Sequence, residues 1–179
     1  MTDISRLYGD SLYELAADEK LTDVLMEEME GVNRLFSDHP DYIRVLSEMS
    51  IQKEVRTDML QESFGGRVQP YMLNFLKLLC ENGMMREFKG CCRAFRKRYD
   101  DDNQIARAVV TSAVPLDEQQ MNALRNRLAK LTNKRIMLVQ NTDSRVMGGL
   151  RVELEGKLLD GTVKGRLAGL NKMITEINL

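Results

Sequence analysis

The stretch Ile136–Val163, IMLVQNTDSRVMGGLRVELEGKLLDGTV, decides how the C-terminal part of the chain is expected to fold. Apolar residues alternate with other residues in it, first at Ile136 and Leu138 and again from Leu150 to Leu154. Alternation with a period of two is typical of β-strands that bury one face. We therefore predict two strands, joined by a polar loop into a β-hairpin.

Two glycine-containing motifs interrupt this stretch. Gly148-Gly149 is expected to form a bulge or a turn with positive φ, and Asp160-Gly161-Thr162 is expected to form a turn that starts a helix. A glycine pair after a strand could also bind a phosphate. That reading needs a Gly-Lys-Ser/Thr loop or three spaced glycines, and neither pattern is present. We therefore interpret the glycines as architecture.

Helical spacing dominates the first part of the chain. Apolar residues recur every three or four positions, which is typical of helices that bury one face. The pattern predicts six helices: one from Ile4 to about Leu15, then Leu21–Phe36, Pro40–Ser47, a helix capped by Ser50 and stopped by Gly65, Pro70–Glu81, and Met84–Tyr99. The fifth is apolar all round and should lie at the centre of a six-helix bundle.

The acidic segment 100–103 is the predicted domain boundary, because a β-branched run, AVVTSAVPL, follows it. Asp117 and Gln120 then match a capping box at the start of another helix. Val163–Ile177 has the spacing of an amphipathic terminal helix. The predicted fold is α+β overall, with an N-terminal six-helix bundle (1–104) and a small C-terminal α/β domain (105–179) that combines a short sheet with amphipathic helices.

Motifs spread over nearly the whole chain resemble one family. They are YGDSLYELA (8–16), NFLKLLCENG (74–83), VTSAVPL (110–116), Asp143, Gly148-Gly149-Leu150, Val152, Asp160-Gly161-Thr162-Val163, Gly165 and Leu167. Together they resemble the delta subunit of rotary ATP synthases, also called the oligomycin-sensitivity-conferring protein. Some positions depart from the residues common in that family: Gly9, Ser11, Met84, Ser144, Met147 and Thr162.

The resemblance implies a non-catalytic stator subunit of a proton-translocating ATP synthase. Such a subunit links the peripheral stalk to the top of the catalytic head and resists torque. N-terminal helices of the head's alpha subunits would bind a groove between the first and fifth helices, at Tyr8, Leu12, Asn74 and Lys77. The C-terminal ends of the stalk b subunits would bind the C-terminal part. The protein would be peripheral, at the cytoplasmic face of the cell membrane, with no cofactor and no nucleic acid.

Composition agrees with an ordinary globular protein. The chain has 179 residues, of which 43% are hydrophobic and 30% charged, enough for one large domain or two small ones. No run approaches the roughly 20 apolar residues of a membrane span. The N-terminus MTDISRLYGD lacks the basic and apolar regions of a signal peptide, so we expect a cytoplasmic protein.

The residue types that commonly carry catalysis are sparse. Cys80, Cys91 and Cys92 lack the spacing of zinc ligands, and His39 is the only histidine. We expect buried thiols and a histidine in a solvated turn before Pro40. No cysteine-histidine pair or serine triad is recognisable, so the sequence gives an enzyme no support.

Charge leaves one alternative open. Residues 1–60 carry a net charge of −8, from fourteen acids and six bases, whereas residues 121–179 carry +6, from five acids and eleven bases. A basic run, Arg93–Arg98, precedes Asp100–Asp102. The basic half could bind nucleic acid, which is our alternative function. The adjoining acids and the helix dipole favour a solvated helix end for the basic run.

Overall fold

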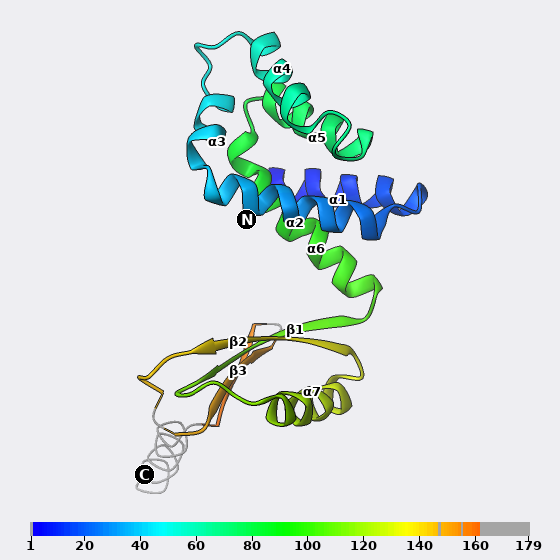
Figure 1. Cartoon of the computed structure of the whole chain (residues 1–179). Coiled ribbons are helices and arrows are strands. Elements are labelled where there is room, and N and C mark those ends of the chain that lie inside the picture. The colour runs from blue at the N-terminus through cyan, green and yellow to red at the C-terminus, as the bar shows by residue number, and fades with distance from the viewer. Residues whose placement is uncertain (1, 147, 155, 162–179) are drawn as a thin grey trace, which may run out of the picture. The chain divides into compact units, whose positions relative to one another are not determined.

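Helices make up the first part of the chain in the computed structural model, which describes residues 2–146, 148–154 and 156–161 (Figure 1). Their bounds are α1 Asp3–Asp18, α2 Thr22–Asp38, α3 Pro40–Leu46, α4 Lys53–Phe64, α5 Pro70–Glu81, the 3₁₀ helix η1 Met85–Glu87 and α6 Phe88–Asp102. The chain divides into two compact units, residues 1–100 and 101–179. The predicted division after residue 104 lies close to this one, and independent folding of the two parts stays a prediction.

Local signals explain where α1, α3 and α5 begin. The Thr2 side chain accepts a hydrogen bond from the Ser5 N–H and so caps α1. Pro40 and Pro70 occupy the first turns of α3 and α5, as their missing N–H groups allow. The prediction that Ser50 caps α4 is wrong: the N-cap is Gln52, without a side-chain bond.

Ser50 has a nearer partner, which explains this error. Its N–H and hydroxyl both donate to Glu48 Oε1, at 3.3 and 3.1 Å. A residue whose side chain is engaged in a local turn cannot also cap a helix that begins later. The sixth helix likewise starts later than predicted, because the 3₁₀ turn Met85–Glu87 precedes α6.

Aromatic rings anchor the core that the helices share. Phe36 packs edge-to-face on Phe88 and on Phe64, at centroid distances of 5.2 and 6.0 Å. Tyr13 packs in the same manner on Phe95, at 5.2 Å. Burying each such side chain contributes roughly 1.5–3 kcal/mol. The rings come from α1, α2, α4 and α6, so one core joins helices far apart in sequence.

The second unit contains a four-stranded sheet of order β2-β1-β3-β4. The strands are β1 Ile105–Ser112, β2 Arg135–Thr142, β3 Leu150–Leu154 and β4 Lys157–Asp160. β1 pairs with β2 in parallel and with β3 in antiparallel orientation, and β3 pairs with β4 in antiparallel orientation. The predicted hairpin between the second and third strands is therefore wrong, because β1 lies between them.

The pairing error has a simple cause. Alternation identifies a strand and its buried face, but it does not identify the neighbour of that strand. The hairpin in the described structure joins β3 to β4 across Gly156, which has a φ of +77°. Asp160, predicted in a turn, ends β4. Thr162 and the predicted helix Val163–Ile177 lie outside the described residues.

Helix α7 (Glu118–Thr132) connects β1 to β2 and covers one face of the sheet. Asp117 and Gln120 form the predicted capping box, and Asn133 ends the helix with a φ of +55°. Leu128 of α7 is buried against Ile136 and Val110. Across the described residues the fold is α+β, with seven α-helices and a small sheet, as predicted at that level.

Candidate functional site

A groove between α1 and α5 is the candidate site. It has a volume of about 410 Å³. Its walls are mainly apolar and aromatic, with two small polar groups, and are formed by Tyr8, Ser11, Leu12, Leu15, Tyr71, Asn74, Phe75 and Leu78. Leu12 is 3% exposed, whereas Leu15 and Leu78 are 39% and 46% exposed. A buried floor with exposed apolar rims is the form of a surface that receives an apolar partner.

Helix α1 is held on its other side by a close crossing with α6. A Cβ on Gly9 would lie 2.5 Å from the Cys91 carbonyl oxygen, and a Cβ on Gly90 would lie 2.6 Å from Ser5 Cβ. The missing side chains let the two backbones approach. Thr2 adds a polar contact, since its hydroxyl donates to Glu87 Oε2 at 2.6 Å. This crossing fixes the position of the first groove wall.

Helix α5 is fixed at its N-terminal end by Glu28 of α2. The Gln69 N–H, just before the helix, donates to Glu28 Oε1 at 2.9 Å. A carboxylate is favourable there because the helix N-terminus carries partial positive charge. Burial nevertheless raises the pKa of Glu28, against the lowering effect of the Gln69 bond. Oε2 of the same carboxylate is buried without a hydrogen-bond partner.

The C-terminal end of α5 is fixed by Arg56 of α4, which is only 3% exposed. Arg56 Nη1 donates to the carbonyls of Cys80 and Leu46, at 3.1 and 3.0 Å, and Nε donates to the Ile51 carbonyl at 3.1 Å. The guanidinium thus meets the partial negative charge at the end of α5. Contacts at both ends set the second groove wall.

The structure brings together three of the four residues predicted for this groove. Tyr8, Leu12 and Asn74 line it. Lys77 does not line it: its Nζ donates to Gln61 Oε1 at 2.8 Å. Sequence reasoning missed five lining residues: Ser11, Leu15, Tyr71, Phe75 and Leu78. All but Phe75 lie three or four positions from a predicted residue.

The C-terminal family motif shapes loops. Asp143 accepts bonds from the Arg145 N–H and guanidinium, which lower the pKa of Asp143. Gly148 and Gly149 have φ values of +56° and +89°, as the prediction of positive φ requires. The Gly161 N–H donates to the Leu150 carbonyl at 2.9 Å.

Asp160 pairs with Arg151 across the β3–β4 ladder at 3.8 Å. Thr162 cannot be placed, as it lies outside the described residues. The described motif residues thus pair with their neighbours in the loops and the sheet. This agrees with an architectural role.

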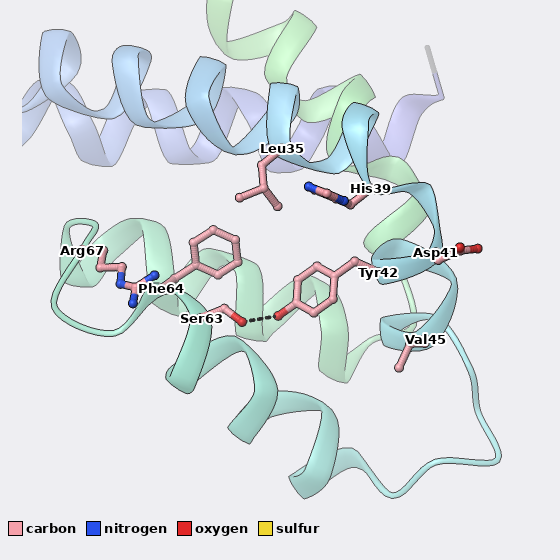
Figure 2. A pocket seen from close by; sticks show the side chains of 8 residues that line it. All are labelled: Leu35, His39, Asp41, Tyr42, Val45, Ser63, Phe64 and Arg67. Atoms are coloured by element: carbon pink, nitrogen blue, oxygen red, sulfur yellow. Dashed lines mark hydrogen bonds between the residues drawn. The ribbon is translucent and has the colours of Figure 1, made fainter.

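A second cavity, of about 570 Å³, lies among α2, α3 and α4 (Figure 2). The rings of Tyr42 and Phe64 flank it, with Leu35 on the α2 side and His39 at the end of that helix. The Tyr42 hydroxyl lies 2.8 Å from Ser63 Oγ and donates to the Met59 carbonyl at 3.1 Å. Burial raises the pKa of Tyr42. These hydroxyls bond within the protein, and sequence reasoning did not anticipate the cavity.

Reactive groups are not assembled in the described part of the chain. Burial raises the pKa of Cys91 and of Cys92 to about 12, and it also raises the pKa of Cys80. Thiols that stay protonated are poor nucleophiles. Among residues 2–146, 148–154 and 156–161, no group of histidine, cysteine and carboxylate side chains could hold a metal ion.

The basic run at the end of α6 makes contacts within the helical unit. Arg96 pairs with Glu30 at 3.1 Å, and the Arg98 guanidinium lies over the Tyr13 ring, 5.6 Å from its centroid. These contacts hold two of its cations against the protein. As for a membrane span, none of the helices in the described ranges is both long and apolar enough to cross a bilayer.

A helical unit with an apolar groove, joined to a small α+β unit, is the architecture of a protein that binds other proteins. Residues 4–174 match the family described as ATP synthase delta (OSCP) subunit. The chain belongs to this family. ATP synthase subunit delta of Lactobacillus gasseri is 30% identical over 175 residues, which cover 97% of this chain and 96% of the relative.

Two further comparisons agree. ATP synthase subunit delta of Gloeobacter violaceus is 30% identical over 174 residues, with 96% of this chain and 94% of the relative covered. The fold resembles a chain of the Toxoplasma gondii mitochondrial ATP synthase hexamer with a TM-score of 0.72. That match has 17% identity and covers 97% of this chain and 98% of the other, so it supports the fold.

Proposed function

We propose that the protein is a non-catalytic stator subunit of a rotary proton-translocating ATP synthase. It links the peripheral stalk to the top of the catalytic head and resists the torque that rotation exerts on the head. Membership of the ATP synthase delta (OSCP) family supports this proposal. It works at the cytoplasmic face of the cell membrane, to which it is attached through the complex.

The apolar groove between α1 and α5 carries the proposal. In our proposal the six N-terminal helices act as one bundle, and the groove receives an amphipathic N-terminal helix of an alpha subunit of the head. Helix-in-groove recognition uses apolar anchors at three- and four-residue spacing. Leu12 and Phe75 form a buried floor for such anchors, and Leu15 and Leu78 form exposed rims.

Substitution of a groove rim tests this contact. Leu78→Glu should weaken binding of a synthetic alpha-subunit N-terminal helix at least about tenfold, because a charge enters an apolar interface. Leu131→Glu is the matched control, since Leu131 is 72% exposed and lies on α7, outside the groove. Isothermal titration calorimetry measures both affinities. Equal affinity for the two variants would place the head contact elsewhere.

The second unit is proposed to hold the C-terminal ends of the stalk b subunits. Gly149 has a φ of +89°, which strongly disfavours a β-branched residue. Gly149→Val should therefore displace the loop before β3 and reduce binding of a b-subunit peptide, at a cost of about 1–3 kcal/mol in stability. Head-peptide binding should stay unchanged. If head-peptide binding fell as well, the two contacts would not belong to separate units.

The relatives do not support the nucleic-acid alternative, and the contacts of Arg96 and Arg98 within the protein count against it. Fluorescence anisotropy with a labelled oligonucleotide tests the point. Measurable affinity at low salt that falls steeply as salt is raised would favour the alternative, because binding through phosphate contacts weakens steeply with salt.

A further inference from the structure

Strand β2 forms one edge of the sheet. In the sheet formed by the described residues, β2 pairs with β1 alone, over all eight residues from Arg135 to Thr142. Proteins commonly protect an edge with proline, lysine, a bulge or a very short strand. The sequence of β2, RIMLVQNT, contains neither proline nor lysine, and its pairing with β1 is uninterrupted. Such an edge can accept another strand.

The backbone groups that face the open side follow from the register. The N–H of Arg135 donates to the Gln104 carbonyl, and the N–H of Asp143 donates to the Ser112 carbonyl. Bonding directions alternate along a strand with a period of two. Odd-numbered residues of β2 therefore bond to β1. The N–H and C=O groups of Ile136, Leu138, Gln140 and Thr142 face the open edge.

The surroundings of this edge are basic and apolar. A cavity of about 550 Å³ runs along it, lined by Arg107, Arg125, Asn126, Ala129 and residues 135–139. Its lining includes three arginines and no acid. Met137 and Val139 point to the same face of the sheet and are 44% and 57% exposed. The site thus offers backbone donors, apolar side chains and positive charge together.

We propose that an extended, acidic segment of a partner protein binds here as an additional strand on β2. Its backbone would pair with the even-numbered residues of β2. Its carboxylates would meet Arg125 on the face that α7 covers, and its apolar side chains would cover Met137 and Val139 on the opposite face. This mode of recognition differs from the helical contacts of the proposed function and does not depend on them.

A second copy of this chain fits the edge less well. In an antiparallel pair of β2 strands, Arg135 of each copy would lie near Thr142 of the other. In a parallel pair the two Arg135 side chains would be neighbours. β2 contains no carboxylate, so neither arrangement supplies a negative charge to the arginines of the cavity. An acidic partner supplies one.

Amide hydrogen exchange on the full chain, read by NMR, tests the proposal. The probe is an eight-residue acetylated peptide of alternating glutamate and valine, matched in length to β2. The control replaces every glutamate with lysine. The acidic peptide should slow exchange of the Ile136, Leu138 and Gln140 amides about tenfold, because exchange requires the new hydrogen bonds to open. The control peptide should leave these rates unchanged.

Two matched variants sharpen the test. Gln140→Pro removes one N–H from the open edge and keeps the ladder to β1, so peptide affinity should fall about tenfold. Gln140→Ala keeps that N–H and should bind within about twofold of the unaltered protein. The exchange pattern of the unaltered protein decides the question even if the proline variant does not fold.

Four results would overturn the proposal: no slowing at the even-numbered amides, equal binding of the two peptides, equal affinity of the two Gln140 variants, or protection of the edge by self-association without peptide. A fifth such result would be that an oligothymidine binds without protecting these amides from exchange. It would show that the arginines bind phosphates and that β2 does not pair.

Discussion

Arg56→Met tests how strongly one buried cation holds the wall of the groove. The substitution keeps a long apolar side chain and removes donors that reach three backbone carbonyls, those of Leu46, Ile51 and Cys80. Each bond from a charged donor is worth about 1.5–3 kcal/mol, so the loss is about 4–9 kcal/mol before offsets. Methionine carries no charge, so the folded variant no longer bears the cost of desolvating a cation. This offsets several kcal/mol of the loss.

The expected net destabilisation is about 2–4 kcal/mol. Urea denaturation of the full chain, followed by far-ultraviolet circular dichroism, should show a lower midpoint with an unchanged m-value. Arg44→Met is the matched control. Its side chain is 74% exposed and pairs with Asp41 at 3.2 Å, so its removal should change stability by at most about 0.5 kcal/mol. If the two variants were equally stable, Arg56 would not anchor α5.

Three further predictions follow from burial. Gly9→Ala places a Cβ 2.5 Å from the Cys91 carbonyl oxygen. Overpacking of about 1–3 kcal/mol should outweigh the gain in helix propensity of about 1 kcal/mol and lower Tm, whereas a raised Tm would contradict the close crossing. Because the pKa values of Cys91 and Cys92 are about 12, both thiols should resist a disulfide reagent until the protein unfolds. The free energy of unfolding should also fall as pH rises above the pKa of an exposed thiol, about 8.5. Fast labelling of the native protein would refute the burial of these two thiols. The raised pKa of Glu28 lets the folded state keep this proton at a pH where the unfolded state has lost it. The free energy of unfolding should therefore fall as pH rises from about 4.3. Glu28→Gln should flatten that fall when unfolding is measured over a series of acidic pH values.

Local signals predicted most of the helical architecture. Pro70 opens α5 because proline suits the first turn of a helix, and Asp117 caps α7 because its carboxylate accepts the Gln120 N–H. Both effects act over a few residues and can be read from sequence. The same reasoning failed at Ser50, where Glu48 competes for the side chain.

Contacts between distant segments were harder to predict. Nothing in the residues of β2 or β3 indicates that β1 separates them, since strand pairing is decided by the whole sheet. In the groove, the family resemblance together with helical spacing pointed to Tyr8, Leu12 and Asn74, which line one groove in the structure. It could not show that Lys77 turns towards Gln61, because that choice depends on how α4 packs beside α5.

The strand order also has a consequence for biosynthesis. The central strand β1 leaves the ribosome first, but its partners β2 and β3 follow only after α7 and the next loop have been made. Pairings between segments distant in sequence form slowly, whereas helices rich in local contacts form fast. We therefore expect the N-terminal helices to fold while translation continues. An unpaired β1 would be exposed until synthesis passes β3, and during this interval the nascent protein would be most vulnerable to aggregation.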